Sequence, residues 1–155
     1  MKRWILILII SLFLLATEIF IGQNFSHSQD FQGQPVIERV AVVSRVIDGD
    51  TIEIEGGEKV RLVGVDAPEL RSIDPVEREL AEKAKEFVDK LCPPGSEIGL
   101  NVDDLEPRDR YGRVLALVYI KDGDIWVNLN VELLRSGLAE ILYMPPSEFN
   151  PYELK

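Results

Sequence analysis

Stretches of β-branched and alternating apolar residues predict a β-rich domain. Thr51 to Glu55 alternates polar and apolar side chains, as a half-buried strand does. Gly56-Gly57 follows it and suits a hairpin turn, because glycine tolerates positive φ. Five strands are predicted in all, at residues 36–47, 51–55, 59–65, 98–102 and 114–120.

The spacing of apolar residues becomes helical after the third predicted strand. Asp74 is suited to cap a helix, Pro75 fits its first turn, and Glu77 completes a capping-box pattern. The prolines at 93–94 end this helix, and residues 128–136 predict a second, short amphipathic helix. The recurring apolar positions of the first helix are Val76, Leu80, Ala84, Phe87, Val88 and Leu91.

Five strands with a helix between the third and the fourth fit an OB-fold. The predicted fold is therefore α+β, a five-stranded Greek-key barrel with two or three helices. Periodicity alone does not separate this fold from other small β-barrels. At 155 residues the chain is long enough for one such domain with its own core.

The N-terminus reads as a targeting segment followed by a tether. Met1-Lys2-Arg3 is basic, and Trp4 to Ala16 carries no charge, as in a secretory signal peptide. The apolar residues 19–21 extend this run, so residues 1–22 are either a cleaved signal or a membrane anchor. Residues 23–35 are polar and predict a flexible linker. We expect a secreted or membrane-anchored protein whose 36–144 domain lies outside the cytoplasm.

The net charge and the scarcity of cysteine and histidine limit the partners and the mechanisms that the chain can have. The formal net charge is −10, and the acidic excess falls on residues 31–155, with 15 Lys and Arg against 25 Asp and Glu. This balance argues against a nucleic-acid partner unless the basic residues are clustered. Cys92 is the single cysteine, so an intrachain disulfide is excluded. His27 is the single histidine and lies before the domain, which argues against a histidine-based mechanism.

Three charged clusters carry the candidate chemistry. Asp50 and Asp66 are hard oxygen donors that suit Ca²⁺, and Glu69 could act as a general base on water. Arg61 and Arg113 could grip phosphate oxygens. Each cluster alone has a plainer explanation, since Asp and Gly form ordinary turns and arginines form surface ion pairs. Two tyrosines could stack on bases or simply pack at the rim of the core.

The clusters occur in an order that resembles the thermonuclease, or staphylococcal-nuclease-like, family. The resemblance runs from about Val42 to Tyr143. It is carried by Ile47-Asp48-Gly49-Asp50-Thr51, by Arg61 with Val65-Asp66-Ala67-Pro68-Glu69, by Asp109-Arg110-Tyr111-Gly112-Arg113, and by Leu134-Arg135-Ser136-Gly137-Leu138-Ala139.

The resemblance implies a role for each matched residue. Asp50, Asp66 and the Ala67 carbonyl would ligate calcium, with Asp48 supporting them. The catalytic set would be Arg61, Glu69 and Arg113. Arg110 and Tyr111 would contact a terminal phosphate, and Tyr143 would lie near the base.

The function implied is a calcium-dependent nuclease acting on single- or double-stranded DNA and RNA, releasing 3′-phosphate products, and expected to be a monomer. A non-catalytic OB-fold binding module remains the alternative. Three departures from the family pattern stand out: Ala67 occupies a position where threonine is common, the chain is unusually acidic, and the sequence ends at Lys155, soon after Pro145-Pro146, where the family usually continues into a third helix. Residues 145–155 are interpreted as a tail, complete or truncated.

Overall fold

The computed structural model describes residues 35–154, so the predicted leader and the linker up to residue 34 lie outside the described residues. Within them are two helices and eight strands. These are β1 Arg39–Asp48, β2 Thr51–Ile54, β3 Lys59–Leu62, β4 Val65–Asp66, α2 Pro75–Leu91, β5 Glu97–Val102, β6 Val114–Asp122, β7 Ile125–Asn128, α3 Leu129–Arg135 and β8 Glu140–Ile141.

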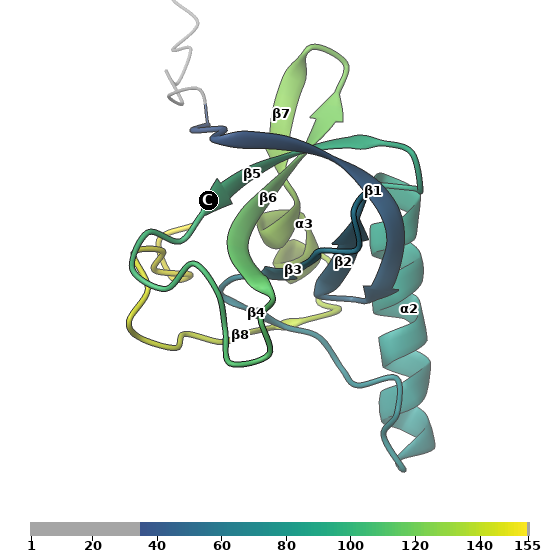
Figure 1. Cartoon of the computed structure of the whole chain (residues 1–155). Coiled ribbons are helices and arrows are strands. Elements are labelled where there is room, and N and C mark those ends of the chain that lie inside the picture. Colours follow the sequence, from purple (N-terminus) through teal and green to yellow (C-terminus); the bar gives the residue numbers. More distant parts are fainter. Residues whose placement is uncertain (1–34, 155) are drawn as a thin grey trace, which may run out of the picture. The chain divides into compact units, whose positions relative to one another are not determined.

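Five strands close into the predicted OB-fold barrel (Figure 1). β1 pairs antiparallel with β2 and β5, β2 pairs with β3, and β5 pairs with β6. The parallel pairing of β3 with β6 closes the ring, with Val60 opposite Val114 and Leu62 opposite Ala116. Closure leaves no free edge on these strands, and β7 extends β6 as a hairpin.

The barrel interior is an apolar core. Ile52, Val60 and Ile98 are fully buried, and burial of each such side chain contributes roughly 1.5–3 kcal/mol. The core is completed by Ala84 and Val88 from α2 and by Leu129 and Leu133 from α3. Figure 1 shows α2 beside β1 on the outside of the barrel.

The structure divides the third predicted strand in two. Gly64 has φ +77° and turns the chain between β3 and β4. A Cβ on Gly64 would lie 2.8 Å from Cβ of Pro151, so glycine also admits the C-terminal segment. β4 then pairs with β8, a strand that the sequence pattern did not predict.

Residues 145–154 form turns against the barrel rather than a third helix. Phe149 and Leu154 pack against a second apolar cluster formed by Val63, Leu117 and Tyr119. No helix within residues 35–154 is long and apolar enough to cross a membrane.

Candidate functional site

Strand pairing brings the three charged clusters to one side of the barrel. Asp50 ends the β1–β2 turn, and its carbonyl accepts a hydrogen bond from the Leu62 amide at 2.9 Å. Thr51 of β2 is the register partner of Arg61 in β3. Arg61 is in turn paired with Leu115, two residues after Arg113, in the parallel β3–β6 ladder. Segments separated by up to about sixty residues of sequence therefore meet through backbone register.

Arg61 bridges the two predicted metal-binding carboxylates. Its side chain is 11% exposed, and Nη1 lies 2.6 Å from Asp50 Oδ2. Nη2 donates to Asp66 Oδ1 at 3.2 Å. Nη1 is buried and lies off the direction of a hydrogen bond to Asp50. The contact of Nη1 with Asp50 is therefore an ion pair, which compensates for the burial of the guanidinium charge.

Asp50 is a desolvated carboxylate at the centre of the site. Burial raises the pKa of its carboxyl to about 7, against the opposing charge of Arg61 and the Ala67 hydrogen bond. The Ala67 amide donates to Asp50 Oδ2 at 3.0 Å, and the amide of Asp50 donates to Asp48 Oδ1 at 3.3 Å. Asp48 thus stabilises the turn that carries Asp50.

These oxygen donors fit a hard divalent cation in their chemistry. Asp50 and Asp66 present carboxylates to one place, and a cation would relieve the desolvation of Asp50. Residues 35–154 contain no group of three or more His, Cys, Asp or Glu gathered closely enough to hold a metal ion. The remaining ligands of such a cation would be backbone and water oxygens, which characterise an open, weak calcium site.

Arg113 joins the same network through Thr51. Arg113 Nε donates to Asp109 Oδ2 at 2.7 Å, and Nη1 donates to Thr51 Oγ1 at 3.3 Å. The Thr51 hydroxyl donates to Asp50 Oδ1 at 2.9 Å. Burial alone would raise the pKa of Asp109, but hydrogen bonds from Arg113 and Tyr111 hold it below its usual value. All three clusters are therefore linked by one continuous set of hydrogen bonds and ion pairs.

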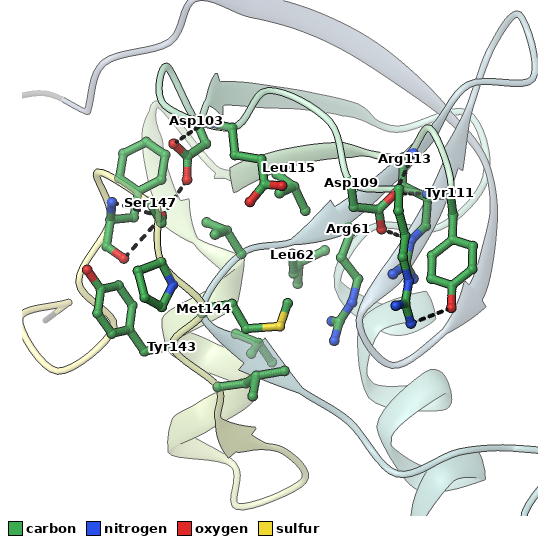
Figure 2. Close-up of a pocket in the computed structure, with 18 residues that line it drawn as sticks. Arg61, Leu62, Asp103, Asp109, Tyr111, Arg113, Leu115, Tyr143, Met144 and Ser147 are labelled. Carbon is green, nitrogen blue, oxygen red and sulfur yellow. Dashed lines mark hydrogen bonds and ion pairs between the residues drawn. The ribbon is translucent and has the colours of Figure 1, made fainter.

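A cavity of about 470 Å³ adjoins this network, and we call it the arginine–tyrosine cavity. Figure 2 shows Arg61, Arg113 and Tyr111 on one wall, Tyr143 on the opposite wall, and Leu62, Leu115 and Met144 between them. Arg110 donates to the Tyr111 hydroxyl at 2.8 Å. The guanidinium carbons of Arg110 and Arg113 lie 4.8 and 5.5 Å from the centre of the Tyr111 ring. The cavity offers cations on one side and a half-exposed tyrosine on the other.

Glu69 is placed in a neighbouring hollow. We call it the acidic hollow; it is lined by Asp66, Ala67, Pro68, Glu69, Glu77, Leu80 and residues 137–140. Asp66 lines this hollow and also pairs with Arg61. Within residues 35–154, no ion pair joins Glu69 to Arg61 or Arg113. Glu69 is exposed, as a base that acts on water must be.

Two residues of the site had no predicted role. Thr51 links two clusters, and Asp109 aligns Arg113. The spacing of Asp109 and Arg113 could have indicated an ion pair, since the two are four residues apart. Thr51 gave no signal, because its partner Arg113 is 62 residues away in the sequence.

The fold and site define an OB-fold protein with an arginine–carboxylate centre beside an aromatic cavity. The model of the staphylococcal nuclease homologue family matches residues 59–154, and the chain belongs to this family. Similar proteins include the thermonuclease of Staphylococcus intermedius, 34% identical over 149 residues, which cover 93% of this chain and 82% of that protein.

Two Bacillus subtilis proteins match a smaller region. Endonuclease YhcR is 34% identical over 118 residues, which cover 70% of this chain but 9% of YhcR. Endonuclease YncB is 36% identical over 109 residues, covering 66% of this chain and 47% of YncB. The chain thus spans less than half of these two relatives.

Proposed function

We propose that this protein is a calcium-dependent nuclease that hydrolyses phosphodiester bonds of DNA and RNA to 3′-phosphate products. The observation that carries the proposal is the network of Arg61, Asp50, Thr51 and Arg113, joined by one ion pair and two hydrogen bonds, which sets two arginines beside a desolvated carboxylate. The names of the relatives, thermonuclease and endonuclease, support the same reaction class.

Each charged side chain has a task in this reaction. Arg61 and Arg113 are held in place by carboxylates and would stabilise the charge that gathers on the phosphoryl oxygens. Preorganised donors cost no rearrangement at the moment of reaction. Glu69 is exposed and would accept the proton of the attacking water. Asp50, Asp66 and the Ala67 carbonyl would hold Ca²⁺, which supplies Lewis-acid polarisation of a phosphate oxygen when bound.

The arginine–tyrosine cavity would bind the rest of the nucleotide. Arg110 and Tyr111 form a cation–π pair, 69% of Tyr111 is exposed, and both are suited to a terminal phosphate. Tyr143 faces them across the cavity and is 42% exposed, so a base could stack on its ring. Stacking tolerates every base, so the cavity would have little base preference.

The alternative is an OB-fold module that binds nucleic acid without cleaving it. A binding module need not keep two carboxylates suited to a cation, an exposed base and two aligned arginines together, as this site does. This combination therefore favours the enzyme.

A nuclease assay separates the two. Plasmid DNA incubated with the purified 36–155 segment and calcium should be cleaved, and EGTA should abolish cleavage. Cleavage that persists in EGTA would remove calcium from the proposal, and no cleavage by a folded, calcium-loaded protein would leave the binding module. We further propose that the protein acts as a monomer outside the cytoplasm, where millimolar calcium can fill a weak site.

A further inference from the structure

A third hollow adjoins the arginine–tyrosine cavity. We call it the hairpin hollow; it is lined by Gly56, Gly57, Glu58, Lys59, Arg108, Tyr111, Gly112 and Arg113. Tyr111 and Arg113 also line the arginine–tyrosine cavity, so the two depressions share a wall. None of the functional roles above falls on Lys59 or Arg108, which also line the hairpin hollow.

The hairpin hollow carries an excess of positive charge. Glu58 is its single lining acid, and it pairs with both Arg39 and Arg108. Hydrogen bonds from these arginines lower the pKa of Glu58, so it is ionised and its one charge is shared. Lys59, Arg39 and Arg108 together outweigh it. In a chain with net charge −10, such a local excess is informative.

Arg108 is anchored at the edge of the hairpin hollow. Its Nη1 donates to the Gly112 carbonyl at 2.9 Å, and Nη2 donates to Glu58. The side chain is still 52% exposed, and a guanidinium has five N–H donors. It can therefore keep both contacts and also bind an anion. A Cβ on Gly56, Gly57 or Gly112 would meet nothing within 4 Å, so the surface there is open.

Charge also decides where a substrate strand can run. A strand held at Arg61 and Arg113 has further phosphates on either side of the bond to be cut. The acidic hollow presents Asp66, Glu69 and Glu77 and would repel them, whereas the hairpin hollow would attract them.

We propose that the hairpin hollow binds a backbone phosphate of the substrate strand, outside the site of cleavage, through Arg108 and Lys59. This inference rests on the proposed nuclease function and adds a second phosphate subsite to it. The ligand is the phosphodiester backbone itself, so the subsite has no base preference.

The test compares a thymidine dinucleotide with a thymidine strand of about fifteen nucleotides, long enough to reach past one OB-fold. Arg108→Ala and Lys59→Ala should each raise KM for the long strand roughly three- to tenfold, and KM for the dinucleotide less than about twofold. The matched controls are Arg135→Ala and Lys83→Ala, which each remove an exposed cation paired with one carboxylate on a helix.

Two further readouts do not depend on turnover. The slope of log affinity against log salt for the long strand should fall by about 0.7 in Arg108→Ala, one phosphate contact on a single strand. Glu58→Gln should strengthen binding, because it removes the hollow's acid and keeps its shape. Fluorescence anisotropy in EGTA measures both.

Equal effects of Arg108→Ala on the two substrates, or effects no larger than those of Arg135→Ala, would overturn the subsite. Absence of cleavage in the parent protein would defeat the nuclease function instead, and the anisotropy series would still decide on the hairpin hollow.

Discussion

Individual side chains of the site are held by other charges before any substrate arrives. Arg113 is fixed by Asp109 and Thr51, and Arg61 by Asp50 and Asp66. Such alignment matters most where charge develops during reaction rather than where a substrate merely binds. The sequence motifs contain nearly all of these residues. They could not reveal the connection through Thr51, since hydrogen bonds between strands depend on register.

Arg113→Ala and Glu69→Gln should separate catalysis from binding. Loss of a preorganised donor costs roughly 10²–10³ in rate, and loss of a general base roughly 10²–10⁴. We expect turnover to fall by at least about 10²-fold in each, while affinity for single-stranded DNA changes far less. Cleavage rate and DNA affinity are measured at one calcium and one salt concentration. Parallel losses in both would assign Arg113 and Glu69 to substrate binding rather than to catalysis.

Asp50→Asn and Asp66→Ala should abolish calcium binding. Two carboxylates with backbone and water oxygens imply a Kd on the order of 10⁻⁴–10⁻³ M, which calorimetry can follow. Asp50→Asn keeps the side chain's size beside Arg61, so the variant should stay folded. Glu82→Ala, an exposed acid on α2, serves as the control. Undiminished calcium binding in both site variants would remove these residues from the metal site.

The barrel strands and α2 followed from patterns that are local in sequence. The Gly56–Gly57 turn has the predicted positive φ, and Asp74 caps α2 by accepting from the Val76 amide at 2.9 Å. The predicted capping box was wrong in detail. The Glu77 carboxylate accepts hydrogen bonds from the Ser72 hydroxyl and the Glu69 amide, and not from the cap residue. Glu77 thereby ties the segment that carries Glu69 to the helix.

β7, β8 and the break of the third strand were not predicted. β8 has two residues and exists because it pairs with β4, seventy-odd residues earlier. β7 follows the last predicted strand, and it forms by pairing with β6. Such pairings depend on the closed barrel, which no local pattern encodes.

Gly49→Ala tests how α2 is seated against the site. A Cβ on Gly49 would lie 2.7 Å from both Ala67 Cβ and Ala84 Cβ, so either the helix or the metal-site turn must move. We expect destabilisation of about 1–3 kcal/mol in denaturant unfolding, with weaker calcium binding. Gly56→Ala is the control: it is strained by its positive φ but meets nothing within 4 Å, and calcium binding should be unchanged. Equal calcium affinity in both variants would contradict this account.

At the scale of the whole described domain, the C-terminal segment is hydrogen-bonded to the loop that precedes the Asp109–Arg113 cluster. The Asp103 carboxylate is fully buried and accepts from Ser147 Oγ and from the Leu105 amide at 3.0 Å. Asp103 and Ser147 both line the arginine–tyrosine cavity (Figure 2). The sequence pattern predicts only a tail at residues 145–155, because a contact across 44 residues leaves no local signal.

Ser147→Ala should loosen this tie. It removes a hydrogen bond to a buried carboxylate, which costs about 1–3 kcal/mol in unfolding free energy. Ser96→Ala, which loses an exposed hydroxyl contact to Pro93, should cost far less. Because Tyr143 and Ser147 line the same cavity, KM should rise while calcium binding stays constant. An unchanged unfolding midpoint would show that the tie contributes little.

The predicted export of the protein decides whether it meets enough calcium to fill the proposed site. The uncharged run from Trp4 to Ala16 follows a basic start, and a calcium site with two carboxylates would remain largely empty at cytosolic calcium levels. A fusion of residues 1–35 to a reporter should therefore reach the membrane or the medium. Lys substitutions at Leu8 and Leu12 should hold the same fusion in the cytosol, because they interrupt the apolar run. Size on a gel separates a cleaved signal from an uncleaved anchor. A parent fusion that stays soluble in the cytosol would contradict export, and calcium would then have to be supplied at concentrations the cytosol does not sustain.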